Sequence, residues 1–369
     1  MCDNFRALTL LFATGNFMDQ RDTKIICTIG PATESYDSLK SLAVAGMDIA
    51  RLNFSHGGHE VHLKRIEMIR KVSKDVGKNI KILQDLPGPK IRLGEIANEP
   101  LYLKTGSKVK IVAGEQKCDS ADSLPLPYAD FADAVYPGCA VYLWDGAIHL
   151  SVERVNGREV ICNVDAGGQI FSRKGVNIPR VSKGLKVITE EDIKHIEFGL
   201  RNNVDYIALS FVRSGADIAE ARGIMDKFGK SVPIVAKVEK QDALDNLEGI
   251  VKESDIVMVA RGDMGVEIGV ENVPMAQKRI IRECMKQGKP SITATQMLLS
   301  MVKSRNPTRA EVSDVANAIL DGSDAVMLSE ETAVGEFPAD ATAMLDKVSR
   351  IMEKELTTRG IKRSGWPKG

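Results

Sequence analysis

The stretch Ser254-Asp-Ile-Val-Met-Val-Ala-Arg-Gly-Asp-Met-Gly-Val-Glu267 carries the most information about the fold of this chain. Its apolar first half is typical of a buried strand, and it leads into a glycine-flanked turn that holds Arg261 and Asp263. Upstream, Val232-Pro-Ile-Val-Ala-Lys-Val-Glu239 repeats the pattern and ends on a lysine and a carboxylate. Two buried strands therefore deliver a lysine, two carboxylates and backbone amides to neighbouring loops. A divalent cation and an anionic substrate are the ligands that such a group would hold.

Short runs of strand type alternate with amphipathic helical patterns along most of the chain. The predicted strands are residues 24–29, 47–52, 80–84, 206–210, 232–237, 256–260, 291–294 and 325–329. The predicted helices include residues 58–74, 190–202, 216–227, 275–287 and 309–320. A strand–helix unit repeated about eight times favours a (β/α)₈ barrel. A doubly wound parallel sheet is the alternative, although no Gly-x-Gly-x-x-Gly motif follows the first strand.

One connection in this pattern is much longer than the others. Between Gln84 and Glu190 the sequence shows short strands at residues 108–113, 140–144, 149–155 and 159–164, separated by turn signals such as Asp145-Gly146 and Asn156-Gly157. This segment predicts an all-β domain, a small β-barrel over residues 89–184, inserted into a loop of the barrel domain, residues 22–88 and 185–369. At the catalytic face such an insertion could serve as a lid. Residues 1–21 are expected to form an N-terminal arm.

The composition excludes several classes of protein. The 369 residues include 43% hydrophobic residues, 50 basic and 50 acidic side chains, and no basic tract, which argues against a nucleic-acid partner. No apolar run approaches the roughly 20 residues of a membrane span, and residues 7–13 are too short for a signal peptide. The six cysteines lack CxxC spacing. We therefore expect reduced thiols in a cytoplasmic protein, with a plastid location left open.

Polar side chains follow several predicted strands, at the end of a barrel where enzymes of this architecture place their sites. Arg51 could hold a phosphate in bidentate fashion, and Asn53 and Ser55 offer oxygen ligands for a hard cation. Asp85 begins a stiff turn that leads into the inserted domain, and Thr295 gives a hydroxyl at the end of the seventh strand. The convergence of these residues on one face is what favours a functional interpretation.

Each of these residues also has a purely structural interpretation. Arg51 could form a surface ion pair, Asp85 could cap its turn, and Lys237 and Glu239 could pair with each other on a solvated rim. The remaining histidines are expected at the surface, and the methionines in the core. These histidines are His59, His62, His149 and His195.

Eight motifs, in order, resemble those of the pyruvate kinase family over about residues 22–355. They are Thr23-Lys-Ile-Ile-Cys-Thr-Ile-Gly-Pro-Ala-Thr33, Ala50-Arg-Leu-Asn-Phe-Ser-His-Gly57, Asp85-Leu-Pro-Gly-Pro-Lys-Ile-Arg92, Ala236-Lys-Val-Glu239, Met258-Val-Ala-Arg-Gly-Asp-Met-Gly-Val-Glu267, Ala294-Thr-Gln-Met-Leu298, Asn306-Pro-Thr-Arg-Ala-Glu311 and Met327-Leu-Ser-Glu-Glu-Thr-Ala-Val-Gly335. The resemblance implies a (β/α)₈ barrel with an inserted β-barrel lid, and phosphoryl transfer from phosphoenolpyruvate to ADP, giving pyruvate and ATP. It also implies a homo-oligomer formed through the barrel domain.

The resemblance implies a role for each site residue. Glu239 and Asp263 would bind Mg²⁺ or Mn²⁺, and Arg51 and Lys237 would hold the phosphoryl group. The other implied contacts are Gly262, Asp263, Thr295 and Ser210 for the substrate, with Lys237, Arg51 and Thr295 as the catalytic group, and His56, Arg92 and Lys174 for the nucleotide.

Two departures from the family pattern lead to further expectations. Asn53, Ser55 and Asp85 match the side chains that bind K⁺ in many members, but Leu86 and Lys90 resemble the branch that works without K⁺. We expect an internal ammonium near Asp85 to replace the ion. The chain also lacks the usual C-terminal domain, which leads us to expect no activation by a sugar bisphosphate.

Two alternative functions stay open at this stage. One is a catalytically silent regulatory homologue that binds phosphoenolpyruvate or nucleotide. The other is a related barrel lyase that acts on pyruvate enolate with Mg²⁺.

Overall fold

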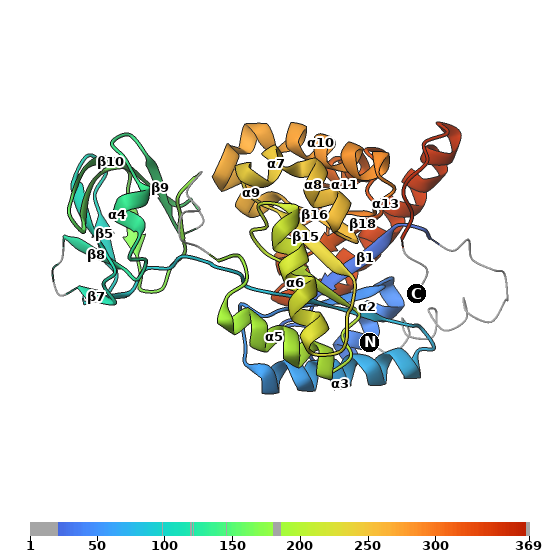
Figure 1. Cartoon of the computed structure of the whole chain (residues 1–369). Helices are drawn as coiled ribbons and strands as arrows, with labels where there is room; N and C mark the ends of the chain where they lie inside the picture. The colour runs from blue at the N-terminus through green and yellow to red at the C-terminus, as the bar shows by residue number, and fades with distance from the viewer. Residues whose placement is uncertain are drawn as a thin grey trace, which may run out of the picture.

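Eight parallel strands close into a barrel in the order β1-β18-β17-β16-β15-β14-β3-β2 (Figure 1). The computed structural model describes residues 21–97, 99–118, 120, 122–144, 146–179 and 186–366. Apart from Arg21, the predicted N-terminal arm lies outside these residues. The last strand pairs with the first, Ala325 opposite Lys24, and this pairing closes the sheet. The prediction of a (β/α)₈ barrel is confirmed, and the doubly wound sheet is excluded.

The barrel strands lie close to their predicted positions. They are β1 (Lys24–Thr28), β2 (Ile49–Asn53), β3 (Lys81–Asp85), β14 (Tyr206–Leu209), β15 (Ile234–Val238), β16 (Ile256–Ala260), β17 (Ser291–Ala294) and β18 (Ala325–Leu328). The second strand begins later than residue 47, and it includes Asn53, which pairs with Asp85. Successive side chains point to opposite faces, so Ile26 and Ile49 fill the barrel interior while Ile25 packs under the outer helices.

Helices cover the outside of the barrel (Figure 1). They are α2 (Tyr36–Ala45), α3 (His59–Asp75), α5 (Glu190–Arg201), α6 (Gly215–Lys227), α7 (Gln241–Asp245), α8 (Leu247–Glu253), α9 (Arg261–Ile268), α10 (Val273–Lys286), α11 (Arg309–Leu320), α12 (Glu330–Ala333) and α13 (Pro338–Thr358), with 3₁₀ turns η1 (Val270–Asn272) and η2 (Leu299–Val302). Capping boxes begin α5 and α11: the Thr189 hydroxyl accepts from the Asp192 amide, and the Thr308 hydroxyl accepts from the Glu311 amide.

The segment between β3 and β14 forms a second β structure with its own hydrophobic core. Its main sheet has six strands in the order β13-β9-β10-β11-β6-β8, and two short pairs, β12-β5 and β4-β7, complete it. Its elements are β4 (Glu95–Ile96), β5 (Leu101–Leu103), β6 (Lys108–Ala113), β7 (Lys117–Cys118), β8 (Ser123–Leu126), α4 (Phe131–Ala134), β9 (Ala140–Leu143), β10 (Ile148–Asn156), β11 (Glu159–Ala166), β12 (Gly168–Ile170) and β13 (Val176–Asn177). The short helix α4 was not predicted.

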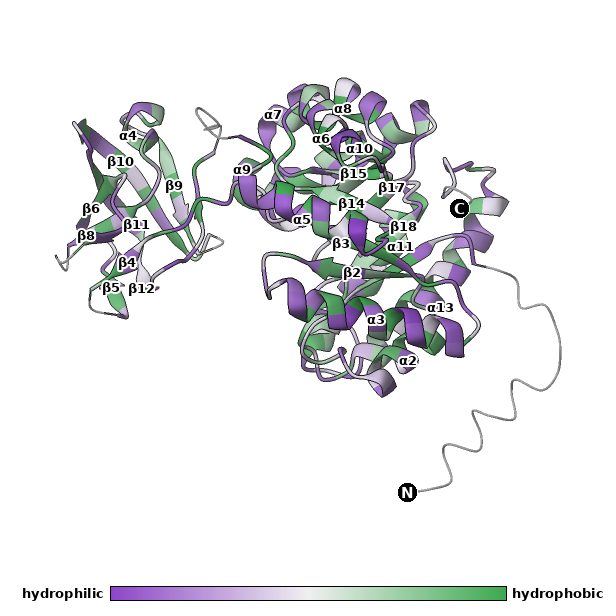
Figure 2. Ribbon diagram, turned by 60° about the horizontal axis from the view of Figure 1, so that its bottom comes forward, coloured by the Kyte–Doolittle hydropathy of each residue, from purple (hydrophilic) through white to green (hydrophobic). Residues whose placement is uncertain are grey.

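The inserted β structure lies to one side of the barrel, and α9 is on the barrel side that faces it (Figures 1 and 2). The sequence predicted a glycine-flanked turn at this point, and that prediction is wrong, because Arg261–Ile268 is helical. The glycines serve close packing instead. A Cβ at Gly265 would lie 3.3 Å from Val270, so the absence of a side chain lets η1 approach the helix.

In the part of the chain that the structure describes, no helix is both long enough and apolar enough to cross a membrane. Five free cysteines occur there, and Cys27, Cys139, Cys162 and Cys284 are buried among apolar groups. Burial raises the pKa of the Cys27 and Cys162 thiols to about 12, so these groups stay protonated at neutral pH.

The contact between α5 and β3 generates a stability prediction. A Cβ at Gly199 would lie 1.9 Å from Oε1 of Gln84, a fully buried side chain whose Nε2 donates to the His195 carbonyl. The extra methyl group has no space, so we expect Gly199→Ala to lower the free energy of unfolding by about 1–3 kcal/mol. Urea unfolding, followed by circular dichroism, measures this change.

A matched control lies on the next barrel helix. Gly223 of α6 is exposed, and a Cβ there would meet nothing within 4 Å. We expect Gly223→Ala to raise stability by up to about 1 kcal/mol, because alanine is the better helix former. Equal effects of the two substitutions would show that α5 does not pack against β3 in this way.

Candidate active site

The carboxyl ends of the barrel strands bring together side chains that are far apart in the sequence. Arg51 ends β2, Asp85 ends β3, Ser210 follows β14, and Lys237 lies near the end of β15. Because all the strands are parallel, these ends meet at one rim of the barrel. Most of the site residues predicted from the sequence lie at this rim.

Asp85 lies at the centre of this group. Its side chain is 2% exposed, with Oδ2 2.7 Å from Arg51 Nε and Oδ1 3.1 Å from Lys237 Nζ. Burial raises the pKa of Asp85, but the charges of Lys237 and Arg51 outweigh burial, so the pKa is lowered overall. Asp85 therefore stays ionised and holds two cations side by side. The sequence suggested two roles for Asp85, a turn cap and a cation ligand. Neither role includes this bridge between Arg51 and Lys237.

Hydrogen bonds hold the side chain of Lys237 in place. Its ammonium group donates to Ser210 Oγ at 2.7 Å and to Asp85, and Ser210 Oγ in turn donates to the Leu86 carbonyl at 2.7 Å. Burial lowers the pKa of Lys237, but the carboxylates of Asp85 and Glu239 more than offset it and raise the pKa overall. The side chain is thus a fixed, fully charged cation. The alternative prediction, that Lys237 and Glu239 lie on a solvated rim, is wrong.

Glu239 contributes a carboxylate with one oxygen held by the backbone and one directed into the site. Oε2 accepts from the Phe211 amide at 2.7 Å, and Oε1 forms an ion pair with Lys237 Nζ at 3.1 Å outside hydrogen-bond geometry. Burial, together with the charge of Asp263, raises the pKa of Glu239 to about 7, although Lys237 opposes the increase. A buried carboxylate oxygen without a hydrogen-bond donor is suited to a cation.

Asp263 lies in the first turn of α9, and its side chain is 44% exposed toward the opening of the site. Lys90 Nζ lies 3.9 Å from its Oδ1. No group of three or more histidine, cysteine, aspartate or glutamate side chains that could hold a metal occurs among the described residues. Glu239 and Asp263 nevertheless fit Mg²⁺, which in proteins uses one or two carboxylates and takes its other ligands from substrate and water.

Thr295, the residue after β17, has a strained backbone conformation that positions its hydroxyl group. Thr295 and Gln296 have φ values of 69° and 54°, in the left-handed region that β-branched residues avoid. Thr295 Oγ1 accepts from the Gly262 amide at 2.9 Å, so this hydroxyl lies at the N-terminus of α9. Phe211, whose amide binds Glu239, also has a positive φ of 57°.

Arg261 supports this strained segment and does not face the site. Its Nη2 donates to the Thr295 carbonyl at 2.7 Å, its Nε donates to the Ala294 carbonyl at 3.1 Å, and its Nη1 pairs with Asp314 at 2.7 Å. The sequence drew attention to this arginine because of its position after a strand. Its guanidinium group therefore binds backbone carbonyls at the end of the neighbouring strand.

The three residues predicted for the nucleotide lie near the inserted domain. Arg92 Nη1 donates to the Arg173 carbonyl at 3.2 Å, and the Lys174 ammonium lies 4.5 Å from the centroid of the Trp144 ring. His56 is exposed at the edge of the rim. Partial burial lowers its pKa, and so do the charges of Arg92, Lys90 and Arg51, which shows that this edge is positively charged.

The residues that match a K⁺ site lie at or just after the ends of β2 and β3. Asn53 Oδ1 accepts from the Ser55 amide at 3.1 Å, and Leu86 is buried, with its carbonyl accepting from Ser210. Lys90 was expected near Asp85. An ion pair joins Lys90 Nζ to Asp263 Oδ1 at 3.9 Å, and Arg51 and Lys237 form ion pairs with Asp85.

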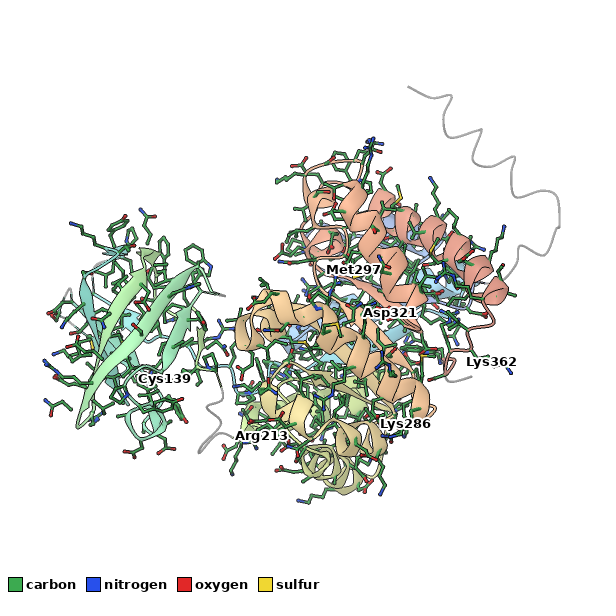
Figure 3. The ribbon with its side chains drawn as sticks, turned by 90° about the horizontal axis from the view of Figure 1, so that it is seen from above. Cys139, Arg213, Lys286, Met297, Asp321 and Lys362 are labelled. Carbon is green, nitrogen blue, oxygen red and sulfur yellow. The ribbon has the colours of Figure 1, made fainter. Side chains whose placement is uncertain are left out.

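A cleft between the barrel and the inserted domain is lined by residues of both. Asp263 and Arg213 contribute from the barrel, Asn177 from β13, and Lys90 from the connecting segment. Figure 3 shows Arg213 at the edge of the barrel that faces the inserted domain. Asn177 Nδ2 lies 3.4 Å from Glu267 Oε2, so α9 carries both Asp263 and a contact with the inserted domain.

The prediction of surface histidines is wrong for two of the four. His62 is fully buried and stacks on Phe54 at 3.9 Å between ring centroids, and His195 is 7% exposed and hydrogen-bonds His59 at 2.8 Å. Phe54 follows β2 and Phe198 lies in α5, with the whole inserted domain between them in the sequence, so sequence periodicity did not reveal this cluster.

Other residues of the site were missed for a related reason. Thr28 accepts from Arg51 Nη1 at 2.9 Å, and the Phe211 amide binds Glu239, but neither residue carries a charge. Thr28 lies within a motif that resembles the family, and this position was the only signal available. Nothing in the sequence around Phe211 indicated a left-handed backbone.

The buried His62 ring generates a prediction about pH. Burial lowers its pKa to about 4, well below the usual 6.5, so the unfolded chain binds more protons than the folded chain between these two values. Stability then falls as the pH drops from about 6.5 to 4, by at most about 3 kcal/mol for this group. We expect His62→Gln to reduce that pH dependence, measured by urea unfolding at several pH values. An unchanged slope would contradict a buried neutral ring.

Comparisons with known proteins agree with this geometry. The family model described as pyruvate kinase, barrel domain, matches residues 20–342. A relative from Synechocystis named pyruvate kinase 2 is 47% identical over 91% of this chain and 57% of its own length. One from Thermococcus litoralis, named pyruvate kinase, is 43% identical over 92% of this chain and 72% of its own. The chain thus spans between about half and three quarters of the length of these relatives.

A solved structure adds evidence for the fold. The crystal structure of a pyruvate kinase from Cryptosporidium parvum superposes with a TM-score of 0.87 at 40% identity, and the match covers 90% of this chain and 70% of that one. The chain belongs to the pyruvate kinase family.

Proposed function

We propose that this protein transfers the phosphoryl group of phosphoenolpyruvate to ADP, giving pyruvate and ATP. The observation that carries the proposal is the buried pair of cations, Arg51 and Lys237, held on Asp85 beside the carboxylates of Glu239 and Asp263. Phosphoryl transfer places negative charge on oxygens and needs little covalent chemistry from the protein, so fixed cations supply most of the catalysis.

The substrate would lie between the α9 N-terminus and the two cations. The amides of Gly262 and Asp263 are in the first turn of α9, where unpaired N–H groups favour an anion, so the substrate carboxylate binds there. It takes over the contact that Thr295 Oγ1 makes with the Gly262 amide. Arg51 and Lys237 then bind the phosphoryl oxygens, with Ser210 keeping Lys237 in place.

In the transfer step one P–O bond breaks and another forms. The bond from phosphorus to the enol oxygen of the substrate breaks, and a bond to a terminal oxygen of ADP forms. Lys237 neutralises the charge that appears on the enol oxygen, and the resulting enolate accepts a proton at carbon to become pyruvate. Thr295 and nearby water are the proposed path for that proton. Mg²⁺ or Mn²⁺ on Glu239 and Asp263 would supply further positive charge for the phosphoryl and enolate oxygens.

The inserted domain would act as a lid over the barrel domain. We assign residues 89–184 to the lid, residues 22–88 and 185–369 to the barrel. The cleft that both line, with Lys90, Asn177 and Asp263 on its walls, supports this assignment. Arg92 and Lys174 on the lid side, with His56 on the rim, would bind the nucleotide phosphates, and the positive charge at this edge supports that role.

Replacing the central lysine tests the proposed role directly. In a coupled assay that detects pyruvate from phosphoenolpyruvate and ADP, we expect Lys237→Met to reduce kcat by at least about 10³-fold, because it removes the cation nearest the transferred group. Lys230→Met is the matched control, since Lys230 Nζ binds Leu200 and Asn203 away from the rim.

The same assay distinguishes the alternative functions. A regulatory homologue would bind phosphoenolpyruvate but form no pyruvate, and a lyase would act without ADP. Full activity of Lys237→Met with an intact circular dichroism spectrum would refute the assignment of this lysine.

We also propose that the reaction proceeds without K⁺. Leu86 has no side-chain oxygen to offer the ion, and Lys90 brings an ammonium group within 3.9 Å of Asp263, at the opening of the site. An internal positive charge there makes a bound monovalent cation unnecessary.

This proposal predicts that the rate in buffer containing only tetramethylammonium as monovalent cation equals the rate with added K⁺ within a factor of about two. Replacing Lys90 by Glu should create a K⁺ requirement, since the ammonium is exchanged for a carboxylate. A tenfold or greater stimulation of the unmodified protein by K⁺ would show the proposal to be wrong.

A further inference from the structure

The side chain of Lys174 rests on an aromatic surface. Its ammonium nitrogen lies 4.5 Å from the centroid of Trp144 and 5.9 Å from that of Phe171. The two rings meet nearly at right angles, with centroids 5.8 Å apart. In the described part of the chain, this nitrogen has cation–π partners and no hydrogen bond or ion pair. The contact therefore holds the charge of Lys174 without neutralising it.

The backbone fixes this arrangement. Strands β9 and β13 pair antiparallel, and beyond their ends the Trp144 amide donates to the Gly175 carbonyl at 2.9 Å. The Leu93 amide donates to the Lys174 carbonyl at 2.9 Å, which ties the same strand to the segment that connects the lid to the barrel. Trp144 and Lys174 thus lie side by side on a braced part of the lid, next to its connection.

Trp144 adopts a conformation that a large aromatic residue avoids. Its φ is 50°, and it begins a turn in which the Ala147 amide donates to the Trp144 carbonyl at 3.0 Å. A Cβ on Gly146 of this turn would lie 3.7 Å from Val266 of α9, the helix that carries Asp263. A left-handed aromatic residue in a turn that approaches the site is the kind of local strain that accompanies function.

We infer that Trp144 is a positioning residue for the nucleotide, because its ring holds the Lys174 ammonium with its charge available, and Lys174 directly precedes Gly175, which lines the cleft. The inference rests on the proposed function, in which Lys174 contacts the phosphates of ADP. A carboxylate in place of the ring would also hold the lysine, but an incoming diphosphate would then have to displace it. The ring gives orientation without a competing anion.

This role predicts a selective kinetic effect. The phosphoenolpyruvate contacts lie on the barrel, at Arg51 and Lys237, so loss of the ring should change the KM for ADP and leave the KM for phosphoenolpyruvate nearly constant. Cation–π contacts at exposed sites contribute about 0.5–1 kcal/mol, which corresponds to a change of about 2- to 5-fold.

Trp144→Asn is the informative substitution. Asparagine tolerates a left-handed backbone, so the variant should fold at least as well as the original chain while it loses the ring. We expect the KM for ADP to increase about 2- to 5-fold, and Trp144→Phe, which keeps an aromatic face, to restore most of the loss. An unchanged KM for ADP in Trp144→Asn, or an equal increase in both KM values, would overturn the inference.

A fluorescence measurement reports on the contact itself. The chain has two tryptophans, and Trp366 lies at the opposite end of the barrel, where its Nε1 donates to the Tyr206 hydroxyl. In a Trp366→Phe background the emission comes from Trp144 alone. ADP should shift that emission saturably, since the phosphates bring negative charge to the ammonium that contacts the ring, and Lys174→Met should abolish the shift. A saturable shift of equal size in Lys174→Met would contradict the inference.

The two measurements separate this inference from the proposed function. Pyruvate formation with an unaltered KM for ADP in Trp144→Asn rejects the role of Trp144 alone. A Lys174-dependent fluorescence shift without pyruvate formation rejects the proposed reaction and supports the role of Trp144 in nucleotide binding.

Discussion

The candidate site depends on one carboxylate, that of Asp85. Arg51 and Lys237 come from different strands and would repel each other in a buried environment where water screens charge poorly. Asp85 lies between them and balances one of the two charges, and Glu239 pairs with Lys237 on its other side. Ser210, Thr28 and Glu239 each contact Arg51 or Lys237. Their positions therefore follow from those of the bridged cations. Removing the bridge would leave Arg51 without its carboxylate partner and Lys237 with Glu239 alone, a far greater loss than that of a surface ion pair.

The second feature of the site is that the backbone, and not only side chains, supplies its binding groups. Phe211 and Thr295 adopt left-handed conformations at the ends of two strands, and each directs a polar group into the site. Such conformations persist only where the surroundings hold them. At Thr295 that support comes from Arg261, which binds the carbonyls of Ala294 and Thr295 and is itself anchored by Asp314. A charged residue next to the site can thus serve it entirely through the main chain.

The third feature is the link between the inserted domain and α9, the helix that carries Asp263. Helix α9 carries Asp263 at its start, and one turn later Glu267 Oε2 lies 3.4 Å from Asn177 Nδ2 of β13. The segment just before β13 holds Lys174 beside Trp144. The inserted domain is therefore tied to the barrel at α9, the helix that also carries Asp263.

The sequence by itself determined the barrel, the inserted β segment and most of the rim residues, because strand and helix periodicity and the charge at strand ends are local properties of the chain. It also placed Lys237 and Glu239 correctly one strand away from Asp263. Only the tertiary structure decided that Asp85 bridges two cations, that Arg261 turns away, that His62 is buried and that Lys90 approaches Asp263. These facts depend on which strand ends and helices meet in space, and that proximity has no periodic signal along the chain. The helix at Arg261–Ile268 is another feature that only the tertiary structure decided. Its glycines predicted a turn, but Gly265 instead lets the neighbouring η1 pack closely against the helix.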